Sequence, residues 1–175
     1  MPTHSDYTVG WISTLPLELT AAMAMLDGDP HPQLASCSSS DQNIYTLENI
    51  YGHNIVMACL PAGKTGIGYA AIVVQHMRSS FDSIRFGLMV GIGGGVPSKG
   101  HDIRLGDVVV SKPSGQFGGV VQYDFGKTVT GGEFEWTGSL NAPPLILLNA
   151  IFTLIARHEL RRNTKFTDML SSVLP

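Results

Sequence analysis

The sequence predicts an α/β fold with a mostly parallel, mixed central sheet flanked by helices. The first observation is composition: of 175 residues, 43% are hydrophobic and 14% are charged, whereas a soluble domain usually has roughly 25% charged residues. Strands that are covered on both faces have nearly continuous apolar sequences, and a domain that contains them has a composition of this kind. The second observation is that strand-like and helix-like patterns alternate along the chain, which is typical of α/β domains. Both observations exclude disorder for most of the chain.

The individual elements follow from local patterns. In chain order we expect a strand at 7–13, a helix at 17–26, strands at 43–48 and 54–60, a helix at 70–80, strands at 86–90 and 108–110, and a helix at 145–160. Pro16 suits the first turn of the first helix, and Tyr51-Gly52 supplies a hairpin turn. The last helix is apolar almost all round, so we expect it to be buried.

Ligands of parallel sheets bind beyond the carboxyl ends of the strands. We therefore expect one rim made of residues 13–18, 62–68 and 91–95 and the loop after Ser111. Residues 111–138 are rich in Gly, Tyr and Phe and have no regular period, which indicates a segment that lines a site.

Composition also excludes several functions. A net charge of −3 gives no field that would hold a nucleic-acid backbone. Residues 141–156 are too short for a membrane span, and the N-terminus has no signal-peptide pattern, so we expect a cytoplasmic protein with no membrane partner. Both cysteines should be reduced, and the six histidines show no metal-ligand spacing, so we expect no metal.

One stretch partly matches a phosphate-binding P-loop. It runs from Ala58 to Thr65 and ends in Gly63-Lys64-Thr65 after a predicted strand. Ala58 stands where a P-loop requires its first glycine. The helix of a P-loop begins directly at the Lys-Thr pair, whereas we expect Gly66 and Gly68 to interrupt a helix here. A P-loop nucleotide binder remains a lesser alternative.

The glycine run at 91–95 is open to two interpretations. It is not a dinucleotide fingerprint, because Val96 stands where the last glycine is needed. Either several residues adopt positive φ, or the backbone approaches a ligand closely. Glu18 also has two interpretations. It lies at the carboxyl end of the first predicted strand, where a ligand would bind, but a helix-dipole contact alone explains an acid in a first turn. Asp107 should begin a strand, and we assign it to loop structure away from the rim.

Four segments together resemble the nucleoside phosphorylase and nucleosidase family. They are Val9-Gly10-Trp11-Ile12 followed by Glu18, Gly66-Ile67-Gly68 followed by Ala70-Ala71, Val90-Gly91-Ile92-Gly93-Gly94-Gly95, and Leu105-Gly106-Asp107-Val108-Val109-Val110-Ser111. Residues 87–97 and 120–127 look like the fungal branch found at the N-terminus of multidomain NACHT, ankyrin or TPR receptor-like proteins. The resemblance covers about residues 7–155.

The resemblance implies cleavage of the N-glycosidic bond of purine nucleosides through an oxocarbenium-like sugar. That reaction needs water or phosphate as nucleophile and an acid for the leaving base, with no cofactor. The implied site residues are Glu18, which positions the water, and the substrate-binding Gly91, Gly93, Gly94, Gly95, Tyr123 and Phe125.

Water is favoured over phosphate. The arginine of phosphorolytic members is absent before Gly91, and Ile92 occupies the place of their serine. Lys64 and Thr65 could contact the 5′-phosphate of a nucleotide substrate, whereas Arg85 should point to the opposite end of its strand.

The family's second half, with a Met-Glu pair for the ribose and an aspartate for the base, has no counterpart here. Asp168 does not replace it, so we expect an incomplete domain at 7–160, followed at 161–175 by a polar tail or a truncated continuation. Two hypotheses remain: a shortened nucleosidase, or a non-catalytic nucleoside-binding or oligomerising remnant. We expect no measurable glycosidase activity from this chain alone, and a homo-oligomer.

Overall fold

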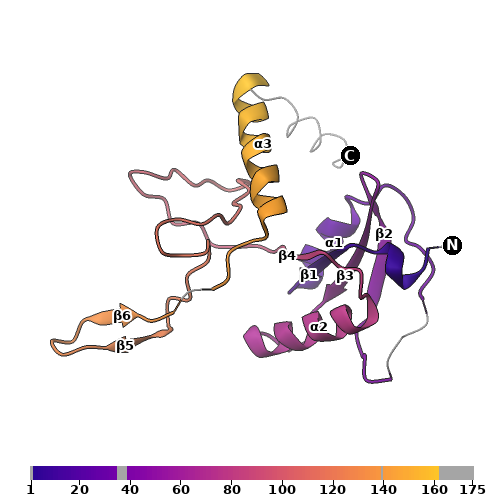
Figure 1. Cartoon of the computed structure of the whole chain (residues 1–175), viewed down its shortest axis with the longest axis horizontal. Helices are drawn as coiled ribbons and strands as arrows, with labels where there is room; N and C mark the ends of the chain where they lie inside the picture. Colours follow the sequence, from indigo (N-terminus) through magenta and orange to yellow (C-terminus); the bar gives the residue numbers. More distant parts are fainter. Residues whose placement is uncertain (1, 35–38, 139, 162–175) are drawn as a thin grey trace. The chain divides into compact units, whose positions relative to one another are not determined.

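The computed structural model describes residues 2–34, 39–138 and 140–161 (Figure 1). The chain divides into two compact units, Met1–Gly94 (unit 1) and Gly95–Pro175 (unit 2). Each unit is described by itself below. The prediction of one domain over residues 7–160 stays a prediction.

Unit 1 contains a four-stranded sheet. After a short 3-10 helix at His4–Asp6, the strands are β1 (Val9–Ser13), β2 (Tyr45–Ile50), β3 (His53–Cys59) and β4 (Phe86–Met89). Their order in the sheet is β2-β3-β1-β4. Strand β1 is parallel to both β3 and β4, and β2 is antiparallel to β3. The predicted mixed, mostly parallel sheet is therefore confirmed.

Two helices, α1 (Pro16–Met23) and α2 (Ile67–Ser80), pack on opposite faces of this sheet (Figure 1). Side chains of successive strand residues point to opposite faces. Accordingly Val56 packs in the cluster that contains Met77 of α2, and Met57 packs in the cluster that contains Ala22 of α1. The sheet is thus covered on both faces, as its apolar strands predict.

The hairpin between β2 and β3 is also confirmed. Its turn places Tyr51 at φ 49° and Gly52 at φ 76°. Two consecutive residues with positive φ are typical of the tight turns whose twist matches paired strands. The turn also fixes the register in which Leu47 faces Val56.

Unit 2 has little regular structure before its helix. Strands β5 (Gly126–Thr128) and β6 (Phe134–Trp136) form a small antiparallel pair, and α3 spans Leu145–Arg161. Among the described residues, no helix combines the length and the apolar run that crossing a membrane requires.

The predicted buried strand at 108–110 is wrong. These residues lie outside every strand, and Val108, Val109 and Val110 are 73%, 73% and 55% exposed. A β-branched run favours a strand only where a partner supplies ladder hydrogen bonds and a surface to pack on. Asp107 therefore does not begin a strand. It closes a turn in which its carboxylate accepts a hydrogen bond from the Arg104 amide at 2.9 Å.

The last helix is predicted correctly, but its burial is not. Phe152 and Leu160 of α3 are 68% and 85% exposed. Apolar composition predicts burial only if another surface of the described chain packs against the helix. No side chain described in unit 2 is buried.

Candidate functional site

The carboxyl ends of three strands of unit 1 meet at one edge of the sheet. Ser13 of β1 is in register with Cys59 of β3, and Ile12 is in register with Met89 of β4. The segments that leave these strands include residues 14–18, 62–68 and 91–94. The structure therefore confirms the predicted rim for these three segments, whereas the loop after Ser111 belongs to unit 2.

Glu18 connects two of these segments. Its Oε2 accepts hydrogen bonds from the backbone amides of Thr14 at 2.7 Å and Leu15 at 2.9 Å. Its Oε1 accepts one from the amide of Ile92 at 2.8 Å. The buried carboxylate thus joins the beginning of α1 to the glycine loop 74 residues further along the chain.

These hydrogen bonds determine the charge of Glu18. The Ile92 amide, followed by those of Leu15 and Thr14, lowers the pKa of Glu18 below its ordinary value of 4.5, and this outweighs the opposite effect of burial. Hydrogen bonds to the charged form of an acid stabilise that form. Glu18 is therefore an anion at neutral pH, which can hold a water or stabilise a positive charge but cannot donate a proton.

The glycine loop is explained by close approach at one position. A Cβ on Gly91 would lie 2.6 Å from Glu18 Oε1, so a side chain there would displace the carboxylate. The alternative of several positive-φ glycines is wrong, because Gly91, Gly93, Gly94 and Gly95 are not among the glycines with positive φ. A Cβ on Gly93 or Gly94 would meet nothing within 4 Å. The fold of unit 1 therefore does not explain these two glycines.

Ser13 is a rim residue that the sequence patterns did not single out. It is 0% exposed, and its Oγ has no hydrogen-bond partner among the described residues. Its strand neighbour Cys59 is a free thiol whose pKa is raised by burial. A buried hydroxyl without a partner costs about 1–3 kcal/mol. A serine at the end of an apolar strand was the available signal, but serine is too common at strand ends to stand out.

Lys64 and Thr65 are exposed beyond the end of β3. The Lys64 amide donates to the Pro61 carbonyl at 3.0 Å, and its Nζ lies 5.4 Å from the centre of the Tyr69 ring. Helix α2 begins at Ile67, after Gly66 with φ +93°. The expected interruption at Gly66 is confirmed, whereas Gly68 lies inside the helix, contrary to expectation. Helix α2 thus begins after Lys64, whereas the helix of a P-loop begins at its lysine.

Arg85 directly precedes β4, at the end of the strand opposite the glycine loop, as expected. Its amide donates to the carbonyl of Thr8 at 2.9 Å. Because Thr8 directly precedes β1, this hydrogen bond holds Arg85 at the amino end of the sheet.

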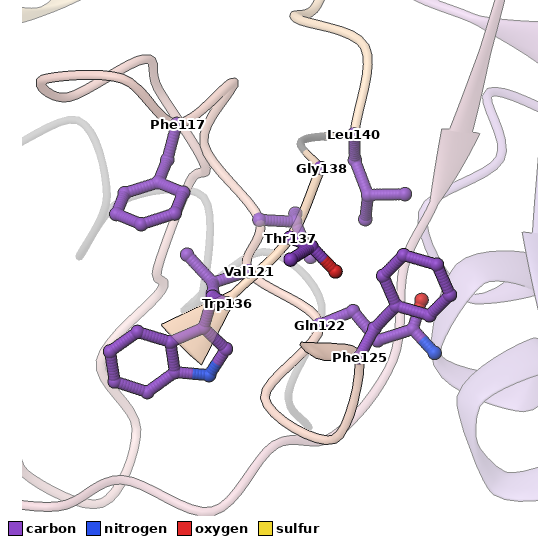
Figure 2. Close-up of a pocket in the computed structure, with 9 residues that line it drawn as sticks. Phe117, Val121, Gln122, Phe125, Trp136, Thr137, Gly138 and Leu140 are labelled. Carbon is purple, nitrogen blue, oxygen red and sulfur yellow. The ribbon is translucent and has the colours of Figure 1, made fainter. Parts of the chain in front are cut away.

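The remaining predicted site residues lie in unit 2. Tyr123 is 81% exposed, and its carbonyl accepts a hydrogen bond from Trp136 Nε1 at 3.0 Å. Phe125 is 57% exposed and lines a pocket together with Trp136 (Figure 2). A Cβ on Gly95 would lie 2.7 Å from the Ile103 side chain, so local packing accounts for this glycine.

In the part of the chain that the structure describes, no group of three or more His, Cys, Asp or Glu side chains is placed to hold a metal ion. Asp168 and Cys37 lie outside the described residues.

Comparison with known proteins gives one informative match. No family model matches the chain, and no solved structure is similar to it. A protein of Hyaloscypha variabilis, described as a nucleotide-binding leucine-rich repeat (NLR)-like protein, is 55% identical over 155 residues. These residues cover 89% of this chain and 15% of the relative. The chain is therefore similar to a small part of a much longer fungal NLR-like protein.

Proposed function

We propose that this chain forms the water-side half of a nucleosidase site, in a domain that hydrolyses the N-glycosidic bond of purine nucleosides. The observation that carries the proposal is the 2.8 Å hydrogen bond from the Ile92 amide to Glu18. It brings together the acid and the glycine loop that the sequence resemblance marks as site residues.

The chemistry of Glu18 suits this role. Oε1 accepts one hydrogen bond among the described residues and Oε2 accepts two, so Oε1 keeps a lone pair that can hold a water. The charge of the carboxylate also stabilises the positive charge that develops on the sugar. The unpartnered hydroxyl of Ser13 supplies a second polar group at the same rim.

Water is a better nucleophile than phosphate for this rim. Tight phosphate binding uses charge-assisted hydrogen bonds, most often from arginine. Residues 13–18, 62–68 and 91–94 contain no arginine, and Lys64 is their only cation. The negative charge of Glu18 beside the glycine loop would further oppose a phosphate ion.

The similarity to an NLR-like protein favours a second candidate, a non-catalytic nucleoside-binding module of a multidomain receptor. The same rim would then bind the nucleoside without cleaving it. Self-association of such a module is compatible with the exposed apolar side chains of α3. The two candidates differ in chemistry and agree in ligand.

The test has a binding arm and a cleavage arm. Calorimetric titration of the 175-residue chain with adenosine should show binding, which Glu18→Gln should weaken and Glu133→Gln, an exposed control, should leave unchanged. A longer protein that contains this sequence together with a catalytic acid should release free ribose and base at a rate independent of phosphate.

Three results are informative against the proposal. Ribose 1-phosphate as the main product would contradict hydrolysis. Binding without cleavage in the longer protein would favour the receptor module. Absence of adenosine binding to the 175-residue chain would contradict both candidates.

A further inference from the structure

A strap of unit 1, residues 27–31, lies along one edge of the sheet. Strand β2 is an edge strand, because β3 is its only neighbour in the sheet. The Asp27 amide donates to the Asn49 carbonyl at 3.0 Å, and the His31 amide donates to the Leu47 carbonyl at 2.6 Å. Edge strands with unpaired carbonyls tend to pair with strands of other chains. By occupying two of these carbonyls, the strap closes the edge.

The imidazole of His31 attaches the strap to two buried side chains. Its Nδ1 is hydrogen-bonded to the hydroxyl of Tyr7 at 2.9 Å, and Tyr7 is 0% exposed. Its Nε2 lies 3.3 Å from Oε2 of Glu48, whose side chain is also buried. Pro30 and Pro32 flank His31 and have no N–H group that could pair with β2. The end of the strap therefore depends on the side chain of His31 as well as on its amide.

Glu48 needs a positive charge beside it. Its buried Oε2 has no hydrogen-bond partner among the described residues, because the contact with His31 has the distance of an ion pair but not the alignment of a hydrogen bond. A buried charge that lacks a partner is strongly destabilising. A protonated His31 compensates the carboxylate, whereas a neutral imidazole does not.

The other charges around the imidazole are few. Within the described chain, no lysine or arginine forms an ion pair with Glu48. Burial, followed by the charges of Glu48 and Asp6, raises the pKa of Tyr7, which is therefore a neutral hydroxyl. On the strap itself, Asp27 and Asp29 are exposed to solvent. The contact between His31 and Glu48 thus dominates the electrostatics of the strap.

We propose that His31 is a pH-sensitive clasp, which holds the strap on β2 while its imidazole is protonated and releases the strap when the proton is lost. Histidine changes its charge between about pH 5 and 8. The stabilisation by the charged pair is complete at the acidic end of this interval, where Glu48 is still ionised, and is lost as the pH rises. Release frees the carbonyls of Leu47 and Asn49. The clasp lies at the edge opposite β4 and does not involve Glu18.

The experiment is amide hydrogen exchange of the whole chain, followed by NMR at about pH 5.5 and about pH 8. Each rate is divided by the intrinsic exchange rate at that pH to give a protection factor. Protection of the Asp27 and His31 amides should fall about tenfold at the higher pH, a loss between those expected for exposed and for buried ion pairs. The amide of Val56, in the buried strand β3, reports opening of the whole fold and should keep its protection.

Two variants should abolish this pH dependence in opposite directions. His31→Gln removes the positive charge, so protection of the strap should be low at both pH values. Glu48→Gln removes the buried charge that needs a partner, so protection of the strap should be high at both pH values. A merely structural role of the two side chains would lower protection in both variants. Far-ultraviolet circular dichroism checks that each variant is folded.

The matched control is His76→Gln. His76 is also partly exposed and its Nδ1 lies 3.9 Å from a buried carboxylate, that of Asp41. Asp41, however, accepts hydrogen bonds from two hydroxyls and a backbone amide, so the charge of His76 is not required. His76→Gln should leave the pH dependence of the strap unchanged.

The wild-type measurement alone can overturn the proposal, without any variant. Equal protection of the Asp27 and His31 amides at the two pH values would do so. A folded His31→Gln variant that keeps the tenfold change would contradict the proposal as well, and so would its loss in His76→Gln. None of these results depends on whether the rim of unit 1 binds or cleaves nucleosides.

Discussion

Unit 1 and unit 2 use similar apolar side chains in opposite ways. Every buried residue of the described chain lies at or before Phe81, in unit 1, although unit 2 has valines, phenylalanines and leucines in abundance. The difference is hydrogen-bonded pairing: three strands of unit 1 are pairwise parallel and covered on both faces. Strand pairing and helix covering, rather than hydrophobicity alone, decide which apolar residues are buried.

The rim of unit 1 and the pocket of unit 2 differ in the same way. The rim is a polar site built on backbone hydrogen bonds to one ionised carboxylate. The pocket has an aromatic lining without a charged residue. Substitutions that remove the hydrogen bonds of Glu18 should therefore change stability and ligand binding together, whereas substitutions of the exposed side chains of unit 2 should have little effect on stability.

The largest expected difference between the units concerns phenylalanine. Phe81 is 2% exposed and packs edge-on against Tyr45, with the ring centres 5.0 Å apart. Phe81→Ala should lower the free energy of unfolding by about 3–5 kcal/mol. Phe152→Ala, at a 68% exposed position of α3, should change it by no more than about 0.5 kcal/mol. Urea denaturation followed by circular dichroism measures both, and equal losses would contradict the assignment of the core to unit 1.

A smaller but still large effect is expected at Glu18. Glu18→Gln keeps the size of the side chain but replaces one acceptor oxygen with an amide NH2, which faces backbone N–H groups. Hydrogen bonds to a charged group are worth about 1.5–3 kcal/mol each, so we expect a loss of about 2 kcal/mol or more. A helix-dipole contact alone would account for only about 0.3–1 kcal/mol.

The control for Glu18 is Glu133→Gln in unit 2, where the side chain is exposed and stability should not change. Urea midpoints of the two variants and the wild type give the comparison. A Glu18→Gln variant as stable as the wild type would show that the three hydrogen bonds contribute nothing to stability.

Acid should destabilise unit 1 chiefly through two carboxylates, because Asp6, whose pKa is also lowered by its hydrogen bonds with Thr3, is exposed to solvent. The pKa of Glu18 is lowered from 4.5 by its backbone hydrogen bonds. Burial by itself would raise the pKa of Asp41, but hydrogen bonds from Ser80, Asn43 and Tyr45 lower it below 3.8. A carboxyl with a lowered folded-state pKa stabilises the fold fully above its unfolded pKa, and this contribution is lost as the pH falls through the folded value.

We therefore expect the contribution of these two groups to the urea midpoint to be constant well above the ordinary pKa values of 4.5 and 3.8, and to fall as the pH drops below them towards the lowered pKa values of the folded state. The Glu18→Gln variant should lose less stability than the wild type over this interval, because one of the two groups is gone. Parallel pH profiles for the two proteins would contradict the contribution of Glu18.

The sequence predicts unit 1 well because its signals are local and mutually consistent. Alternating apolar residues, Pro16 at the start of a helix and Tyr51-Gly52 in a turn each specify their own neighbourhood. The same reasoning fails at Val108–Val110, because a strand needs a partner and no local pattern reveals whether one is present. It fails for the burial of α3 for the same reason.

The candidate site could be predicted only in part. Glu18 and Gly91 were identified from a resemblance, and the structure supplies the reason for their association, the Ile92 amide. Ser13 lies within the predicted rim, but its unpaired hydroxyl could not be predicted, because the lack of a partner is a property of its surroundings. Of the residues that line the pocket around Trp136, the sequence predicts only Phe125 as a site residue. The others, among them Phe117 and Gln122, come together with Trp136 only once the hairpin has folded.

The smallest expected effects separate two glycines of one loop. Gly91→Ala should cost about 1–3 kcal/mol, because the added Cβ would lie 2.6 Å from Glu18 Oε1 and must displace it. Gly93→Ala meets nothing within 4 Å and needs no positive φ. It should leave stability unchanged or raise it slightly through the unfolded chain. If residue 93 is glycine so that a ligand can approach the backbone, Gly93→Ala should still weaken adenosine binding in the calorimetric assay. A Gly93→Ala variant that is stable and binds adenosine normally would remove this residue from the site while leaving Gly91 and Glu18 in it.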